Sequence, residues 1–217
     1  MKKLVLSVVF SLLYITSASA GVNVGVSGAV GIFSASAKES NPTTSKTTGS
    51  GSEYGSAAFG SVFAEAVLAD KLIVGVDYLP SALETETAET AKSQKGTADA
   101  ITTATNKIQV DFEHMTTLYA GVMLNDNLYV KAGFVQVDVI TNEDLGTGSN
   151  YGDTELDGSM FGFGYHNAMD NGMFIRVEGS YMDFDGATQT SSSNADRKIE
   201  LTSLDGVTGK VSFGKSF

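Results

Sequence analysis

Hydrophobic and polar residues alternate with a period of two in eight segments of this chain. The first segment has branched aliphatic residues on one side of an extended chain: Val22, Val24, Val26, Val30 and Ile32. A period of two is typical of a β-strand with one buried face. The pattern predicts strands over residues 21–35, 56–69, 72–80, 106–124, 128–140, 155–168, 173–184 and 198–217.

The connections between these segments alternate between short and long. Tight turns are expected at Asp70-Lys71, Asn125–Asn127 and Asp170–Gly172, where Asn, Asp and Gly tolerate positive φ. In the last of them, Asn171-Gly172 is typical of a hairpin in which both residues have positive φ. Four long polar loops are expected over residues 36–55, 81–105, 141–154 and 185–197. An even set of strands joined in this way predicts an all-β, eight-stranded antiparallel up-and-down transmembrane barrel, with three short periplasmic turns and four long outer loops.

Charged residues fall on only one side of the predicted strands. A basic group on the lipid side costs about 2–4 kcal/mol near the midplane, so the apolar side is expected to face lipid. The charged side is then expected to form a network inside the barrel: Glu65, Asp77, Asp111, Glu113, Lys131, Arg176, Glu178 and Lys210. Because eight strands leave an interior that side chains can fill, a salt-bridged plug is expected. The alternative is a narrow gated pore in which Lys131, Arg176 or Lys210 changes partner.

The first twenty residues have the pattern of an export signal. Lys2 and Lys3 precede an apolar stretch, and Ala18-Ser19-Ala20 is a small-residue cleavage site. Cleavage there predicts a signal peptide over 1–20 and a single barrel domain over 21–217. The loss of Lys2 and Lys3 would lower the net charge from −11 to −13. So acidic a chain has no basic stripe to neutralise the phosphates of a nucleic acid.

Candidate catalytic and binding groups are few. The chain has no cysteine, which excludes thiolate catalysis and thiolate metal sites. His114 and Thr116 could belong to a lipid-modifying site, but the sequence indicates no acid to orient the histidine. His166 is expected to be a hydrogen-bonded histidine in the lumen. We therefore predict no catalytic residue, no cofactor and no metal site.

Two further acidic patterns do not predict a ligand. The segment Asp183–Gly186 begins like a calcium loop but lacks the remaining ligands at the required spacing. The acidic residues of the third loop are expected to be solvated, with divalent cations near lipopolysaccharide as the alternative: Glu143, Asp144, Asp153 and Glu155.

Aromatic residues near predicted strand ends are candidates for girdles at the two headgroup levels. They are Tyr78, Tyr119, Tyr129, Tyr181, Phe213 and Phe217. Tyr119 and Tyr129 have the inward parity, which argues against a girdle position for these two.

The chain resembles the small eight-stranded outer-membrane barrels of Gram-negative bacteria, such as the OmpA transmembrane domain, OmpX and the opacity-type proteins. The resemblance covers residues 21–217, and its most specific local element is the terminal alternation of Val211, Phe213 and Phe217, which looks like that family's assembly signal. Lys215 departs from the family pattern. The resemblance implies a monomer in the outer membrane, inserted by the barrel-assembly machinery and surrounded by lipid and lipopolysaccharide.

The expected role is therefore structural or interactive, through loops that meet an extracellular partner, and not enzymatic. A narrow ion or small-solute pore is the first alternative, and a lipid-modifying outer-membrane enzyme is the second. A soluble lipocalin-like barrel is the alternative fold, but it would need an apolar lumen.

Overall fold

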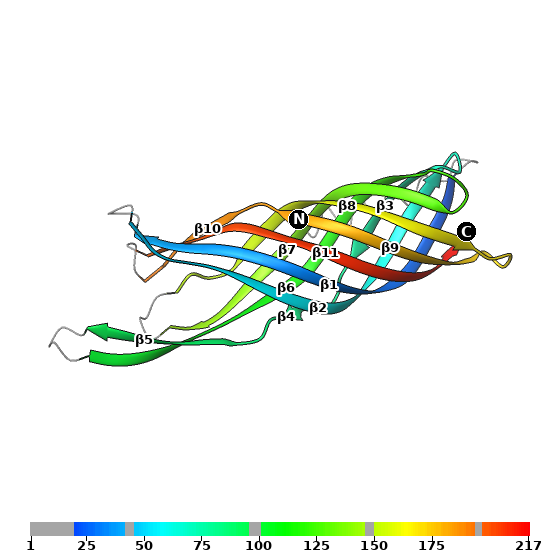
Figure 1. Cartoon of the computed structure of the whole chain (residues 1–217). Helices are drawn as coiled ribbons and strands as arrows, with labels where there is room; N and C mark the ends of the chain where they lie inside the picture. Colours follow the sequence, from blue (N-terminus) through cyan, green and yellow to red (C-terminus); the bar gives the residue numbers. More distant parts are fainter. Residues whose placement is uncertain (1–19, 42–45, 96–100, 146–149, 194–196) are drawn as a thin grey trace.

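One closed antiparallel sheet forms the wall of the molecule (Figure 1). The structure, a computed structural model, describes residues 20–41, 46–95, 101–145, 150–193 and 197–217. The strands of the wall are, in ring order, β1 (Ala20–Asn41), β2 (Lys46–Leu68), β3 (Leu72–Tyr78), β6 (Ile101–Met123), β7 (Leu128–Asp144), β8 (Thr154–Ala168), β9 (Met173–Phe184) and β11 (Lys198–Ser216). Because β11 pairs with β1, the ring is closed and the predicted eight-stranded barrel is confirmed. The predicted signal peptide lies almost entirely outside the described residues.

The wall closes with a stagger. A path that starts at Val30 on β1 and follows directly paired residues around the ring returns to β1 at Ala20, ten residues away. Closing a sheet into a barrel requires such an offset, and it tilts the strands relative to the barrel axis. The tilt is visible in Figure 1.

The predicted outer loops are wrong in part, because strands continue into them. β1 and β2 extend as a paired ladder to Asn41 and Lys46, well inside the expected loop over 36–55. Three short strands also lie in expected loops: β4 (Leu83–Glu84), β5 (Ala88–Lys95) and β10 (Ala187–Thr190). These segments have no alternating apolar side, since in water a hairpin ladder is held by its backbone hydrogen bonds with both faces solvated.

The three short turns lie at the predicted positions, but the first and the last differ from the expected turn geometry. The first turn is one residue earlier than expected: Ala69 (φ 49°) and Asp70 (φ 57°) are its central residues, and the Lys71 amide donates to the Leu68 carbonyl over 3.1 Å. Two positive φ values identify the primed turn that suits a twisted hairpin. In the last turn only Gly172 (φ 78°) is positive, and not Asn171, so this turn is not the expected Asn-Gly hairpin.

A β-bulge in β6 reverses the side on which its residues point. Glu113 pairs with Asp138, but Thr116 pairs with Gln136, so two residues oppose Val137 alone, and His114 has a φ of 53°. Before the bulge, Val110 and Phe112 therefore pack against the interior cluster. This corrects the prediction for Asp111 and Glu113, which lie on the outer surface and not in the lumen. An inserted residue shifts a period-two pattern to the opposite face.

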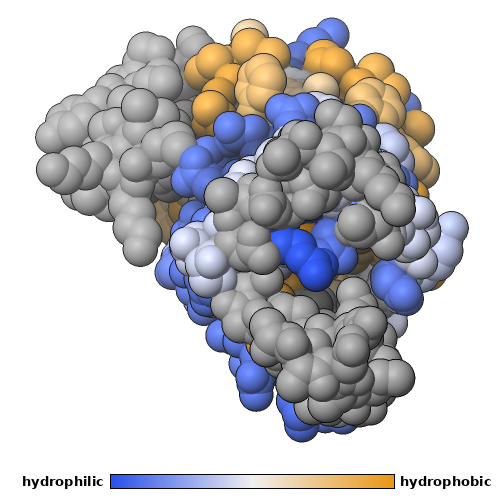
Figure 2. All heavy atoms as spheres, turned by 90° about the vertical axis from the view of Figure 1, so that its left-hand side faces the viewer, coloured by the Kyte–Doolittle hydropathy of each residue, from blue (hydrophilic) through white to orange (hydrophobic). Residues whose placement is uncertain are grey.

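The outer surface is divided into an apolar band and a polar rim. Exposed aliphatic and aromatic side chains cover the band, among them Val26 (58% exposed), Val30 (64%) and Phe134 (76%). Acidic residues on the outer face follow it toward the hairpin end, where Asp205 is paired with Asp183 and Glu155 with Asp138. Figure 2 looks onto that end, with hydrophilic residues near the viewer and a hydrophobic wall along the upper margin. Separately, the described residues contain no helix long and apolar enough to span a membrane.

We expect the first turn to be strained. Replacing Ala69-Asp70 by Asn-Gly (A69N/D70G) should stabilise the barrel by about 1–2 kcal/mol, because glycine has no Cβ to destabilise the left-handed conformation and asparagine tolerates that conformation better than alanine does. The measurement is the urea midpoint of the protein folded in lipid vesicles. Gly172→Ala is the opposing control and should lower the midpoint. An unchanged or lowered midpoint for A69N/D70G would contradict the proposed strain at Ala69 and Asp70.

Candidate functional site in the barrel interior

A bidentate ion pair lies at the centre of the interior. Arg176 on β9 donates from Nη1 to Glu65 Oε2 on β2 over 2.8 Å and pairs through Nη2 with the other oxygen. Asn23 donates to Glu65 Oε1 and Tyr119 donates to Glu65 Oε2, each over 2.8 Å. Glu65 is 1% exposed and Arg176 is 6% exposed. Four donor atoms thus satisfy a carboxylate that would otherwise be very costly to bury.

A second carboxylate, Glu178 on β9, is bound by two residues of β7. Lys131 Nζ on β7 lies 2.8 Å from Glu178 Oε2, and the Tyr129 hydroxyl donates to the same oxygen over 2.7 Å. The Lys131 ammonium also lies 4.3 Å from the centre of the Tyr119 ring, a cation–π distance. Both ion pairs are therefore connected through the two tyrosines.

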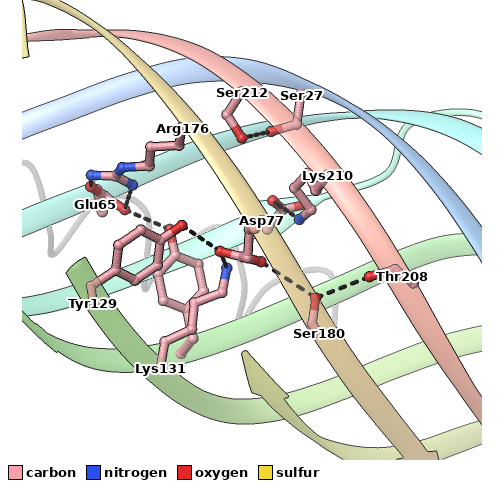
Figure 3. Close-up of polar contacts among 12 residues, drawn as sticks. Ser27, Glu65, Asp77, Tyr129, Lys131, Arg176, Ser180, Thr208, Lys210 and Ser212 are labelled. Carbon is pink, nitrogen blue, oxygen red and sulfur yellow. Dashed lines mark hydrogen bonds and ion pairs between the residues drawn. The ribbon is translucent and has the colours of Figure 1, made fainter. Parts of the chain in front are cut away.

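Lys210 and Asp77 form the third ion pair of the layer. Lys210 Nζ on β11 donates to Asp77 Oδ2 on β3 over 2.8 Å. Hydroxyl pairs fill the remaining space, with 2.9 Å between the oxygens of Ser27 and Ser212. Figure 3 shows these side chains pointing toward one another from strands far apart in sequence. We call these eight residues the ionic layer: Glu65, Asp77, Tyr119, Tyr129, Lys131, Arg176, Glu178 and Lys210.

Glycines on neighbouring strands make room for the two tyrosines. Gly75 is paired with Tyr119 and Gly164 with Tyr129. A Cβ on Gly75 would lie 2.7 Å from the Tyr119 hydroxyl, and one on Gly164 would lie 2.5 Å from the Tyr129 hydroxyl. The tyrosines can lie flat against the wall and reach the carboxylates only because these positions lack a side chain.

An apolar cluster fills the interior between the ionic layer and the hairpin end. Its members come from most strands of the wall and include Phe59, Leu79, Met115, Val135, Val137, Leu156, Met160, Met182, Phe184 and Leu204. On the turn side, Phe174 is fully buried against His166, with ring centres 4.9 Å apart. His166 Nδ1 accepts a hydrogen bond from Arg176 Nε over 2.9 Å. The interior is therefore layered, with charges between two hydrophobic regions.

The structure brings together six of the eight predicted interior charges: Glu65, Asp77, Lys131, Arg176, Glu178 and Lys210. The other two, Asp111 and Glu113, are displaced to the outer face by the β6 bulge. Tyr119, Tyr129 and Asn23 were missed as members of the network. The inward parity of the tyrosines was a usable signal, but their glycine partners can be identified only once the strand register is known.

The remaining candidates lie on the outer face. His114 Nδ1 is 3.1 Å from Asp138 Oδ2, so the structure supplies the acid that the sequence did not indicate. However, the Thr116 hydroxyl donates to the His114 carbonyl over 3.0 Å and is not hydrogen-bonded to the imidazole. A nucleophile aligned with its base is thus missing from this dyad. No group of three or more metal-ligating side chains is found among the described residues.

The polar rim contains ion pairs of its own. Arg197 pairs with Glu39 and so connects the β10–β11 connection to β1. A hydrogen bond from Lys38, over 3.0 Å, lowers the pKa of Glu200, and a hydrogen bond to Glu89 raises the pKa of Lys107. The Ser192 amide donates to the Asn150 carbonyl over 2.7 Å, which joins two further connections. The hairpins on this side of the rim therefore hold one another in place.

Removing one partner of the central pair should be strongly destabilising. We expect Glu65→Ala to cost about 3–5 kcal/mol in unfolding free energy, because it leaves the Arg176 guanidinium buried without a counter-charge. Urea unfolding in vesicles measures the effect. Glu89→Ala is the control, since the Glu89–Lys107 pair is exposed at the rim; it should leave the midpoint nearly unchanged. If both substitutions lowered the urea midpoint equally, the buried pair would contribute no more to stability than the exposed pair does.

The glycine–tyrosine contact gives a separate test. Gly164→Ala should displace the Tyr129 ring and destabilise the barrel by about 1–3 kcal/mol, as expected for overpacking. Gly209→Ala is the matched control, because a Cβ there meets no atom within 4 Å. Near-ultraviolet circular dichroism reports the displacement of the tyrosine ring, and the urea midpoint reports the stability of the barrel. Tolerance of Gly164→Ala with an unchanged tyrosine signal would contradict the packing described above.

Comparison with known proteins gives matches at the level of the fold. No family model matches the chain, and no curated protein matches it. Among solved structures, the outer membrane protein OprG from Pseudomonas aeruginosa is 16% identical with a TM-score of 0.50, and the match covers 92% of this chain and 97% of OprG.

Two further matches have lower TM-scores. Ail, the attachment invasion locus protein of Yersinia pestis, is 14% identical with a TM-score of 0.37, over 88% of this chain and 98% of Ail. The outer membrane protease OmpT from Escherichia coli is 8% identical with a TM-score of 0.43, over 93% of this chain and 98% of OmpT. One fold can host unrelated activities, so these matches do not define an activity. The chain has the fold of the small outer-membrane β-barrel proteins.

Proposed function

We propose that this protein is a monomeric integral protein of a Gram-negative outer membrane, with a filled barrel and a rim of β-hairpins that makes contacts outside the cell. The observation that carries the proposal is the division of one continuous wall into an apolar band and an acidic, hydrogen-bonded rim. An apolar outer band suits the hydrocarbon core of a bilayer, and the short turns then lie on the periplasmic side. Lipopolysaccharide would surround the band on its outer side.

The layered interior supports a structural role over a conducting one. The charges of the ionic layer are paired, and the apolar cluster lies between that layer and the outside. An ion crossing the barrel would have to break buried pairs and then pass the apolar cluster, and both are costly. A non-enzymatic role is supported by the missing nucleophile at His114. The narrow pore and the lipid-modifying enzyme therefore rank below a surface role.

The alternation of apolar residues on β11 supports insertion by the barrel-assembly machinery. Val211 and Phe213 point outward from β11 and are 48% and 50% exposed, and Phe217 is 71% exposed. The Phe217 amide donates to the Val22 carbonyl over 2.9 Å, so Phe217 also helps to close the ring. Lys215, the departure from the family pattern, lies 5.0 Å from the centre of the Phe217 ring.

Single cysteines test the proposed orientation cleanly, because the chain has none of its own. We expect Tyr54→Cys, in the rim, to react with a membrane-impermeant maleimide on intact cells. Asp126→Cys, in a short turn, should react only after the outer membrane is permeabilised, and Val207→Cys, in the band, should react in neither state. Labelling of the Asp126→Cys variant on intact cells would contradict the proposed orientation. Labelling of the Val207→Cys variant would contradict burial of the band in lipid.

Planar-bilayer recording decides between the filled barrel and the pore. Folded protein, identified by its heat-dependent gel shift, is expected to give no discrete conductance steps. Steps that change with Arg176→Glu or Lys131→Glu would overturn the filled-barrel proposal and make the ionic layer a gate.

A further inference from the structure

We propose that the unpaired edge of β2 binds an extended polypeptide of basic character by strand addition. This inference rests on the proposed function, because it names the surface through which the rim makes contact with a partner. The surface is formed by residues 46–61, which we call the free edge.

The free edge results from unequal pairing on the two sides of β2. On one side, β2 pairs with β1 along its whole length, from Leu68 opposite Ala20 to Lys46 opposite Asn41. On the other side, it pairs with β3 only from Val62 to Leu68, because β3 ends at Tyr78. In the described part of the chain no strand pairs with residues 46–61 on that side. The continuing strands β4 and β5 pair with β6 instead, and Figure 1 shows their hairpin splayed away from β1 and β2.

An unpaired strand edge presents a row of backbone donors and acceptors, and an added strand is the ligand that satisfies such a row. Sixteen residues are ample, since an ordinary strand has about 5–6. Natural edges are commonly blocked by proline, by lysine or by bulges. The free edge contains no proline, and its only lysine is Lys46 at the far end. The edge is therefore open to main-chain pairing.

Side chains beside the free edge specify an alternating partner. Ala57 and Phe59 on β2 point toward the interior cluster, and Leu79 and Leu83 border the same opening from the other wall. On the outward side, Tyr54 is 78% exposed to solvent. An added strand would therefore place every second side chain against apolar groups and the others in water, which is the pattern of a strand with one apolar face.

The charge around the free edge specifies a basic partner. Glu53 lies within the edge, and Glu84 and Glu86 lie on the opposite side of the opening. All three are exposed, and none of them forms an ion pair with another described residue. Glu84 and Glu86 lie on the outer face, since Glu84 is paired with Asp111. Lysine or arginine side chains at the outward positions of the added strand would therefore be favoured, while Glu53, on the same face as Ala57, adds negative charge at the rim end. Such rim charges act mainly on the rate and selectivity of association.

Hydrogen exchange tests the proposal directly. The probe is a ten-residue peptide of alternating valine and lysine with blocked ends, added to the full-length protein folded in lipid vesicles. The control peptide has two of its valines replaced by proline and keeps the same charge. We expect amides within residues 49–61 to exchange at least about tenfold more slowly with the probe, while the control peptide has no effect. No protection, or equal protection by both peptides, would overturn the inference.

Charge reversal and cell-surface labelling complete the test. In E84K/E86K the valine–lysine peptide should bind about tenfold more weakly, as expected for the loss of two exposed charge contacts on the outer face, and a valine–glutamate peptide should bind more tightly. Unchanged affinities would overturn the basic character of the partner. If the Tyr54→Cys variant is labelled on intact cells but the peptide does not bind, this inference fails while the proposed function stands. If that variant is not labelled, the proposed function itself fails.

Discussion

The structure depends first on the absence of water inside a bilayer, which obliges every backbone group there to find a partner within the protein. The ring meets that requirement where each strand has a neighbour on both sides, which holds for β2 from Val62 to Leu68. Beyond Tyr78 the wall separates between β2 and β3, and the first unpaired residues of β2 lie beside Val30 of the apolar band, since Val30 pairs with Ala58. Farther toward the rim, solvent can hydrogen-bond the unpaired edge, so the constraint that closes the barrel in lipid no longer applies there.

The interior follows from the width that closure imposes. Eight strands enclose a space that side chains must fill, and this chain fills it in two ways. In the ionic layer each buried charge has an opposite charge, and Glu65 and Glu178 also accept hydrogen bonds from hydroxyl or amide donors, so the cost of desolvation is offset locally. Nearer the rim, aliphatic and aromatic residues fill most of the space. The paired charges determine which residues meet across the axis, and the apolar cluster keeps water away from them.

The sequence predicts the wall well and the rim poorly. The eight strands and the short turns follow from period-two alternation and from Asn, Asp and Gly at the connections, because lipid imposes that pattern on the outer side. The rim strands carry no such pattern, since water contacts both of their faces. The outward position of Asp111 and Glu113 could not be predicted, because the parity appears continuous until the bulge at His114 is known. Tyr119 and Tyr129 acquire their role only through glycines on adjacent strands.

The bulge in β6 also separates two parts of the protein that can change independently. Below it, inward positions are tied to the ionic layer by register, and a substitution there alters contacts made by several strands. Above it, the same strand presents the opposite parity, so its charged residues meet solvent and tolerate exchange. A single inserted residue thus acts as a boundary between an interior of fixed volume and a variable surface. A hairpin grafted at this position would leave the lumen unchanged only if it kept Val110 and Phe112, which pack against the interior cluster.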